Sequence, residues 1–291
     1  MKIGITGVNG LIGRRVAALA RERGHEIIGF SRHPGPGSRR FTTEEIPDVT
    51  GCDAILNLAG ESVIGLWTAA KRRAIKDSRV LSTRRIVEAI RAASPPPRIL
   101  VNGSATGIYG DTGHIAADEG APRGPGFLAE VCKAWEKEAR PARDLGVRVV
   151  LLRTGMVLAR EGGALAAMLP VFRLGLGGKL GNGRQWVSWI HIEDAAALAL
   201  AALEGPTLDG PLNATAPHPV RNADFTRALA GVLKRPAFLT VPAFALRAAA
   251  GGFSAELLES RKVLPAAAAA SAFPFRFPTI ESALQDLLGN H

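Results

Sequence analysis

The feature that most constrains the fold lies within the first 25 residues. A short apolar run, Ile3–Thr6, leads into three glycines, Gly7, Gly10 and Gly13, and into a segment with helical spacing, Leu11–Arg23. The first glycine permits a tight strand-to-helix turn, the second lets backbone approach a phosphate, and the third lets the helix pack closely on the strand. Because N–H groups at a helix N-terminus point toward such a turn, this loop predicts a dinucleotide site.

The rest of the first half continues the alternation of strand and helix. Short apolar runs bounded by turn residues alternate with segments of helical periodicity, which is typical of a parallel sheet covered by helices on both faces. We expect a doubly wound α/β fold of the Rossmann type with six or seven strands. The further strands predicted are Glu26–Phe30, Ala54–Leu58, Arg98–Asn102 and Val147–Leu152, and the further helices are Ala69–Ala92 and Leu128–Leu145.

The residues after the second predicted strand indicate which dinucleotide is preferred. A site for NAD usually places a carboxylate there, which accepts a hydrogen bond from the ribose 2′-hydroxyl. This sequence has Phe30, Ser31, Arg32 and His33 at that point, and none of them is acidic. The planar guanidinium of Arg32 can donate to a 2′-phosphate instead. The expected cofactor is therefore NADP(H).

The composition changes after about residue 160, where a glycine-rich stretch is followed by mixed elements. We predict an NADP(H)-binding domain over residues 1–160, which also draws on elements within 185–215. Most of residues 161–291 should form a smaller, C-terminal substrate lobe. Candidates for binding a polar or anionic substrate lie in and after the glycine-rich stretch, because cations beside an amide suit such a ligand. They are Lys179, Arg184, Gln185 and Trp186.

Four further segments resemble a single family across nearly the whole chain. They are NLAGES at residues 57–62, KDSR at 76–79, FLAEVCKAWE at 127–136 and RQWVSWIH at 184–191. The sequence is similar to an atypical, extended branch of the short-chain dehydrogenases/reductases, the NAD(P)-dependent "epimerase family proteins". Members of this family carry a small C-terminal domain, which here corresponds to about residues 240–291.

The resemblance also implies which residues contact the dinucleotide. The glycine loop contributes Asn9, Leu11 and Ile12 besides its three glycines, and the turn after the strand Ala54–Leu58 lies beside the cofactor. The remaining contacts implied are Ser31, Arg32, Leu58, Ala59, Gly60, Arg79 and Arg153. Further along, Asp194 is expected to cap a helix over Ala195–Leu203, and the neighbouring His191 is expected to be structural.

The catalytic pair of the superfamily is missing. Hydride-transferring members use a tyrosine as general acid/base and a lysine four residues later, which lowers the tyrosine pKa. The chain has one tyrosine, Tyr109, and Gly113 stands four residues after it. If Glu136 is aligned with the acid that often follows the pair, Leu128 and Cys132 occupy the two places.

Three interpretations of the chemistry remain open. In the first, Tyr109 is the acid/base, and Ser104 or Thr106 donates to a substrate oxygen. In the second, Glu130, Cys132 or Lys133 transfers the proton, although a spacing of three between Glu130 and Lys133 also suits a surface ion pair. In the third, the protein binds NADP(H) without turnover, as a cofactor sensor or a partner-binding protein.

Charge alone does not indicate a nucleic-acid partner. The formal net charge is +10, but the densest basic cluster, at residues 71–79, has no interleaved aromatic residues, and aromatics make up only 5% of the chain. We therefore expect a solvated basic surface and disfavour nucleic-acid binding. The partner expected is a small molecule, and no pattern indicates an oligomeric state.

Other features disfavour metal binding, export and membrane insertion. Cys52 and Cys132 are too few for a disulfide framework or a zinc site. No metal is predicted, because the histidines show no ligand spacing; they are His25, His33, His114, His191, His218 and His291. The chain opens directly into a strand and contains no apolar run of 18 residues, so we expect a cytoplasmic protein with no membrane segment.

Overall fold

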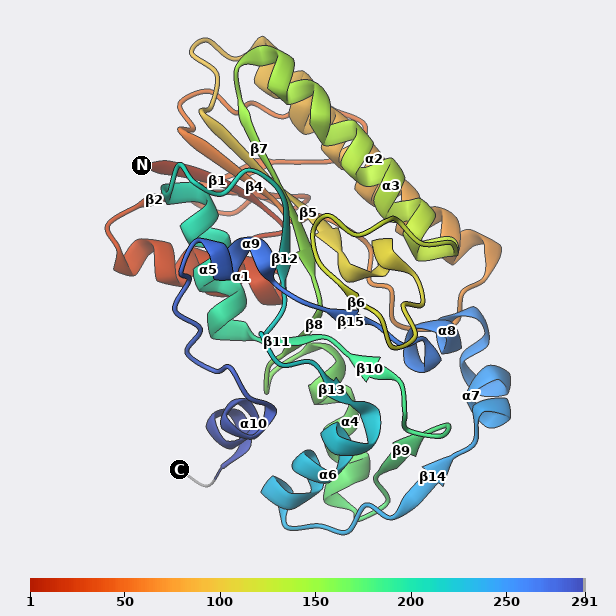
Figure 1. The fold of residues 1–291 in the computed structure, drawn as a ribbon. Coiled ribbons are helices and arrows are strands. Elements are labelled where there is room, and N and C mark those ends of the chain that lie inside the picture. The colour runs from red at the N-terminus through yellow and green to blue at the C-terminus, as the bar shows by residue number, and fades with distance from the viewer. Residues whose placement is uncertain (290–291) are drawn as a thin grey trace.

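A seven-stranded parallel sheet forms the centre of the molecule (Figure 1). The structure is a computed structural model that describes residues 1–289, so His291 lies outside the described residues. The strand order is β12–β7–β5–β4–β1–β2–β3, and every neighbouring pair is parallel. The prediction of a Rossmann-type fold with six or seven strands is confirmed. The strands are β1 (Lys2–Thr6), β2 (Glu26–Ser31), β3 (Ser38–Arg40), β4 (Ala54–Asn57), β5 (Ile99–Ala105), β7 (Arg148–Thr154) and β12 (Gly210–Ala214).

The strand order reverses next to β1. The chain adds β2 and β3 on one side of β1, then returns to add β4, β5, β7 and β12 on the other. At the carboxyl end of β1, Thr6 pairs with Phe30 of β2 and with Asn57 of β4. The loops that follow these three strands therefore leave the same edge of the sheet side by side. In doubly wound sheets, the crevice at such a reversal is where ligands bind.

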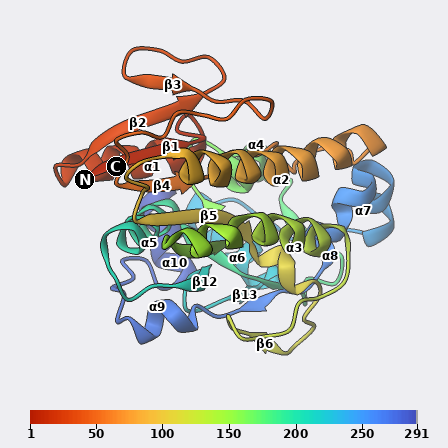
Figure 2. The ribbon, with the colours of Figure 1, turned by 90° about the horizontal axis from the view of Figure 1, so that it is seen from above.

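Two pairs of helices cover the sheet. α1 (Leu11–Glu22) and α5 (Ile192–Glu204) pack on one face, whereas α2 (Ala69–Ala92) and α3 (Phe127–Ala139) lie side by side on the other (Figures 1 and 2). Because both faces are covered, the middle strands are continuously apolar, and residues 54–56 of β4 are completely buried. The helix predicted over Leu128–Leu145 ends earlier, at Ala139, and a 3₁₀ turn with Pro141 near its start continues from it.

A second lobe follows β7 and has its own core. The core lies between α4, α6 and α10 (Ile280–Leu288), and it includes Phe172, Trp189 and Phe225. The glycine-rich stretch contributes a short strand, β9, which pairs in parallel with β14. The elements of the lobe are β8 (Met156–Leu158), α4 (Gly163–Arg173), β9 (Gly178–Leu180), β10 (Trp186–Val187), β11 (Trp189–His191), β13 (Val220–Arg221), α6 (Asn222–Leu233) and β14 (Leu239–Val241).

The last fifty residues return across the molecule. β15 pairs in parallel with β6 (Ala116–Ala117), which lies in the loop after β5, and α9 packs on β12 with Ala268 inside the core of the sheet. α10 packs on α6 in the second lobe. This segment thus ties both halves of the chain together. Its elements are α7 (Ala243–Ala250), a 3₁₀ turn (Gly251–Phe253), α8 (Ser254–Leu258), β15 (Lys262–Val263), α9 (Ala266–Ala270) and α10 (Ile280–Leu288).

The start of α5 differs from the prediction. Asp194 does not cap the helix, because α5 begins at Ile192, three residues before the predicted start at Ala195. The cap is His191, whose Nδ1 accepts a hydrogen bond from the N–H of Glu193 at 3.1 Å. The carboxylate of Asp194 instead accepts the backbone N–H groups of Arg276 and Phe277, both at 2.9 Å. His191 is thus structural, as expected, and Asp194 fastens the C-terminal segment to α5.

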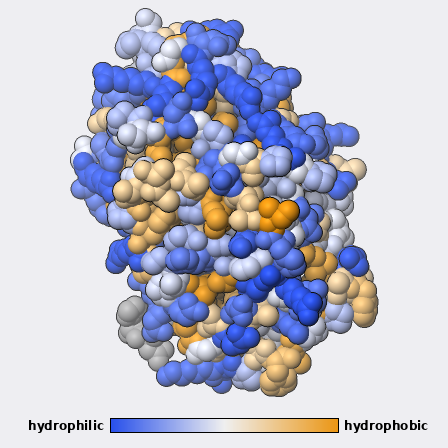
Figure 3. All heavy atoms as spheres, viewed as in Figure 1, coloured by the Kyte–Doolittle hydropathy of each residue, from blue (hydrophilic) through white to orange (hydrophobic). Residues whose placement is uncertain are grey.

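Hydrophilic residues cover most of the upper part of the face in Figure 3, where α2 and α3 run in Figure 1. Hydrophobic residues on this face form smaller, separate groups. No helix within the described part of the chain is long and apolar enough to cross a membrane.

The approach of α1 to the end of β1 predicts a strict requirement at Gly13. A Cβ added there would lie 2.2 Å from the carbonyl oxygen of Gly7, whereas a Cβ on Gly231, in α6, would meet no atom within 4 Å. Gly13→Ala should therefore lower the free energy of unfolding by about 1–3 kcal/mol. Gly231→Ala should leave it unchanged or raise it by up to ~1 kcal/mol, since alanine favours helix. Urea unfolding followed by circular dichroism measures both; equal effects would contradict the proposed packing.

Candidate dinucleotide site

The glycine loop has the shape of a phosphate cradle. Gly7 has a φ of +66°, which favours glycine, and its carbonyl oxygen accepts the N–H of Gly10 at 2.8 Å. Helix α1 starts directly after Gly10, and no side chain within residues 1–289 caps this end. The N–H groups of its first turn, at Leu11 and Ile12, are therefore left for an external acceptor. A pyrophosphate is the kind of group that such a helix end accepts.

A hydrogen-bond network joins the loop after β4 to the end of β1. The hydroxyl of Thr6 donates to Oδ1 of Asn57 at 2.6 Å, and it accepts the N–H groups of Leu58 and Ala59 at 3.0 and 3.1 Å. Asn57 in turn donates to Oδ1 of Asn102 in β5 at 2.7 Å. Neither Thr6 nor Asn102 was among the predicted site residues. Asn57 opens the NLAG segment, and this was the one sequence signal for the network.

Arg79 reaches the same edge of the sheet from α2. Its Nη1 donates to the carbonyl oxygens of Glu61 and Ile75, each at 2.9 Å, and its guanidinium lies 5.2 Å from the centre of the Trp135 ring. A Cβ on Gly60 would lie 3.2 Å from Cζ of Arg79. The NLAGES and KDSR segments thus form one structural unit, in which the turn after β4 packs on α2. Burial lowers the pKa of Arg79.

The residues expected at the end of β2 lie at the surface. Ser31 is half-buried and Arg32 is exposed, and within the described residues Arg32 makes no hydrogen bond or ion pair. The Arg32 guanidinium is thus available at the side of the glycine loop opposite to the turn after β4. The predicted cofactor contacts in the loops after β1, β2 and β4 therefore lie along the same edge of the sheet.

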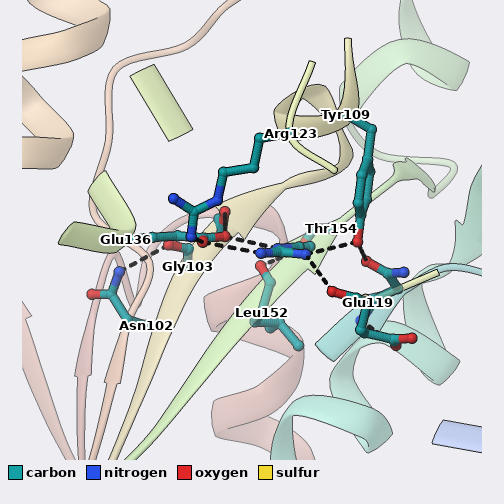
Figure 4. A network of polar contacts seen from close by, with 11 residues as sticks. Asn102, Gly103, Tyr109, Glu119, Arg123, Glu136, Leu152 and Thr154 are labelled. Atoms are coloured by element: carbon teal, nitrogen blue, oxygen red, sulfur yellow. Dashed lines mark hydrogen bonds and ion pairs between the residues drawn. The ribbon is translucent and has the colours of Figure 1, made fainter. Parts of the chain in front are cut away.

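Arg153 is placed differently, inside a buried network between α3 and the sheet (Figure 4). It pairs with Glu136 through two contacts, from Nε to Oε1 at 2.8 Å and from Nη2 to Oε2 at 3.1 Å, and the two side chains are 3% and 0% exposed. Burial opposes its charge, but the hydrogen bond and the charge of Glu136 outweigh burial and raise the pKa of Arg153. The hydroxyl of Ser104 also donates to Glu136, at 2.9 Å.

Comparison with known proteins identifies the family. Residues 3–213 match the model of the NAD dependent epimerase/dehydratase family, and residues 241–287 match a domain of unknown function, DUF1731. This chain belongs to the NAD dependent epimerase/dehydratase family. The resemblance to epimerase family proteins with an additional C-terminal domain is thereby confirmed.

Three relatives illustrate the similarity. An epimerase family protein of Mycobacterium leprae, ML0860, is 40% identical over 97% of this chain and 94% of its own length. The SDR39U1 homologue of Arabidopsis thaliana is 37% identical over 99% of this chain and 87% of its own; it is named as chloroplastic, so the expected cytoplasmic location stays a prediction. The crystal structure of human SDR39U1 (isoform 2) with NADPH covers all of both chains at 35% identity, with a TM-score of 0.94.

Tyr109 does not present its hydroxyl to an open site. It lies in the 3₁₀ turn Thr106–Tyr109 and is 3% exposed. The hydroxyl donates to Oδ1 of Asn213 at 2.7 Å and accepts from Arg153 at 2.8 Å. Burial raises the pKa of Tyr109, although Arg153 opposes this. Ser104 and Thr106 are also buried, and the roles suggested for all three stay predictions, with Tyr109 and Ser104 already engaged elsewhere.

The positions of the missing catalytic pair hold a half-buried leucine and a buried cysteine. Leu128 contacts the 3₁₀ turn, since a Cβ on Gly107 would lie 3.2 Å from its Cβ. One turn further along α3, Cys132 is buried, and burial raises its pKa to about 11, so the thiol is neutral at pH 7. Lys133 and Glu130 form an ion pair at 2.7 Å near the surface, as their spacing also allowed. The proton-transfer roles suggested for Glu130, Cys132 and Lys133 stay predictions.

The candidate substrate residues do not converge on one site. The amide of Gln185 donates to the carbonyl oxygens of Leu180 and Leu257, both at 3.1 Å. Lys179 lines an open cavity of about 450 Å³ between α6 and β14. Trp186 lies against two cations, with Arg221 4.1 Å and Lys262 4.8 Å from its ring centre. Arg184 is exposed. Within residues 1–289, no three His, Cys, Asp or Glu residues lie together as metal ligands would.

The buried ion pair predicts a large difference between two neighbouring glutamates of α3. Glu136→Gln should lower the free energy of unfolding by about 3 kcal/mol, because it leaves the charge of Arg153 buried and unpaired. Glu138 is the matched control: it also forms a double contact with an arginine, Arg84, but that pair is 23% and 49% exposed. Glu138→Gln should cost less than ~1 kcal/mol. Urea unfolding tests this, and similar losses for both variants would rule out a special role for the buried pair.

Proposed function

We propose that this chain binds NADP(H) along the carboxyl edge of the sheet and acts as an oxidoreductase or epimerase on a small polar or anionic molecule. The observation that carries the proposal is the glycine cradle at the N-terminus of α1, with the unpaired Arg32 beside it. Family membership supports dinucleotide binding, and the human relative crystallised with NADPH supports the choice of cofactor.

Different residues of this chain would bind different parts of the dinucleotide. The N–H groups at the start of α1 would bind the pyrophosphate, and Arg32 would bind the 2′-phosphate at the end of β2. The turn at Leu58–Gly60, held by Thr6 and Arg79, would form the wall on the other side of the loop. When bound, the nicotinamide supplies a hydride donor or acceptor.

The sheet edge beyond this turn would position a substrate. The ends of β5 and β7 carry Ser104 and Thr154, and α3 supplies the apolar side chain of Leu128. The hydroxyl of Thr154 is half-buried and would be a polar contact, whereas that of Ser104 would first have to leave Glu136. Arg153 would act through Glu136 and Ser104, by fixing the end of β7 against α3, rather than by contact with the dinucleotide.

Arg32 is the sharpest test of the cofactor. Arg32→Ala should weaken NADPH binding by about 1–3 kcal/mol, because a hydrogen bond between two charged groups is lost, and should leave NADH binding nearly unchanged. Titration of each cofactor, followed by energy transfer from tryptophan to the reduced nicotinamide, measures both affinities. If the unmodified protein binds neither cofactor, or binds both equally, the proposal fails.

A second function, NADP(H) sensing without turnover, is favoured by one specific observation. The places of the catalytic tyrosine and lysine hold Leu128 and Cys132, an apolar side chain and a neutral thiol. No proton donor of the usual kind then faces a substrate from α3. The protein would report cofactor occupancy to a partner instead of converting a substrate.

Hydride exchange separates the two functions. The oxidoreductase activity predicts transfer of deuteride from labelled NADPH to at least one member of a panel of carbonyl compounds, measured by mass spectrometry. The epimerase activity predicts conversion of at least one nucleotide sugar into its epimer in the presence of NADP⁺, measured by NMR. Loss of this transfer in Tyr109→Phe would assign the acid/base to Tyr109. Retention of it would place the acid/base at another residue, with Glu130, Cys132 and Lys133 as the remaining candidates. A sensor would bind NADPH and exchange no label with any compound.

A further inference from the structure

Glu61 carries the one carboxylate in the turn after β4, and its position is firmly fixed. Its N–H donates to Oγ of Ser78 at 2.9 Å, and its carbonyl oxygen accepts from Arg79 at 2.9 Å. Its carboxylate lies 2.6 Å from Nζ of Lys71, in the first turn of α2. The side chains of Glu61 and Lys71 are 42% and 23% exposed, so the pair lies at the rim of the site.

The pair lies across the glycine loop from Arg32. β1 separates β2 from β4 in the sheet, so the turns after β2 and β4 flank the loop at a distance of about two strand spacings, ~10 Å. The hydrogen bond from Lys71 lowers the pKa of Glu61, and the charges of Lys71, Arg32 and Arg79 act in the same direction against burial. Glu61 is thus ionised at neutral pH, and Lys71 is the cation in direct contact with it.

This arrangement matters because the two cofactors differ in charge. A 2′-phosphate adds nearly two negative charges to the dinucleotide, close to Arg32. An uncompensated carboxylate on the other side of the loop would repel NADPH more strongly than NADH. Paired with Lys71, Glu61 contributes almost no net charge. Arg32 then acts on the 2′-phosphate without an opposing carboxylate.

We infer that the Glu61–Lys71 ion pair is a determinant of cofactor preference: Lys71 neutralises Glu61 and thereby keeps the site selective for the 2′-phosphate. The inference rests on the proposed binding of NADP(H) and adds a second determinant to Arg32. The role is electrostatic, so it requires no contact between Lys71 and the cofactor.

The test is a double-mutant cycle on cofactor affinity. Lys71→Met removes the charge but keeps the length of the side chain, and it should lower the preference for NADPH over NADH by about fivefold to tenfold at low salt. Glu61→Gln should raise that preference or leave it unchanged. The double variant Glu61→Gln/Lys71→Met should recover most of the preference lost in Lys71→Met, because the bare carboxylate is gone. The change in Lys71→Met should shrink in 0.5 M NaCl.

Glu88→Gln is the matched control. Glu88 pairs with Arg85 at 2.7 Å in the same helix, on the order of 25 Å along the axis from Lys71. It should leave the affinity for both cofactors unchanged. If Lys71→Met weakens NADPH and NADH by the same factor, or if the double variant keeps the full change, the pair is structural and the inference is overturned. If the unmodified protein binds neither cofactor, the proposed function itself is wrong. If Lys71→Met keeps the full preference for NADPH, only the role of the Glu61–Lys71 pair is refuted.

Discussion

The structure of the site depends on how closely α1 approaches the end of β1. With Gly13 against the carbonyl oxygen of Gly7, the helix starts so near the strand that no side chain fits between them. The loop must then turn within a few residues, and Gly7 adopts a left-handed conformation to do so. The same constraint leaves the first N–H groups of α1 uncapped and directed at the crevice where the strand order reverses. The close packing of α1 on β1 and the exposure of the first N–H groups of α1 therefore have the same cause.

The buried side chains of α3 make structural contacts. In hydride-transferring relatives of the superfamily, the corresponding helix presents a tyrosine and a lysine to the site. In this chain the helix turns Cys132, Trp135 and Glu136 into the protein, where Glu136 holds Arg153 and Ser104. A buried ion pair stabilises little overall, but removal of either partner is costly, so it specifies one arrangement. The end of β7 is thus held against α3 by structural contacts.

The sequence was sufficient for the fold and for the edge of the sheet where the site lies, because both follow from local patterns. Apolar runs specify buried strands. Glycines at positions 7, 10 and 13 indicate a tight turn, and this inference requires no knowledge of distant residues. Contacts between distant segments were not predictable in this way. One example is the hydrogen bond from the N–H of Leu58 to Thr6, and another is the acceptance of the Arg276 and Phe277 N–H groups by Asp194. Both depend on packing between segments that are far apart in the sequence. The positions of the substrate candidates depend on such contacts as well, since Lys179 lines a cavity beside α6 and β14, whereas Trp186 lies against Arg221.

Charge is distributed so that each element contributes a different part of the recognition of an anionic cofactor. The uncapped end of α1 offers backbone dipoles, β2 ends in an exposed and unpaired Arg32, and α2 brings Arg79 and Lys71 to the opposite side. The turn on that side carries a carboxylate, Glu61, and it is paired with Lys71. A site that favoured NAD would need the reverse, with a free carboxylate at the end of β2 and no cation to oppose it. Under the proposed function, only the few cations around the glycine loop contribute to cofactor binding, whereas most of the residues behind the net charge of +10 lie elsewhere.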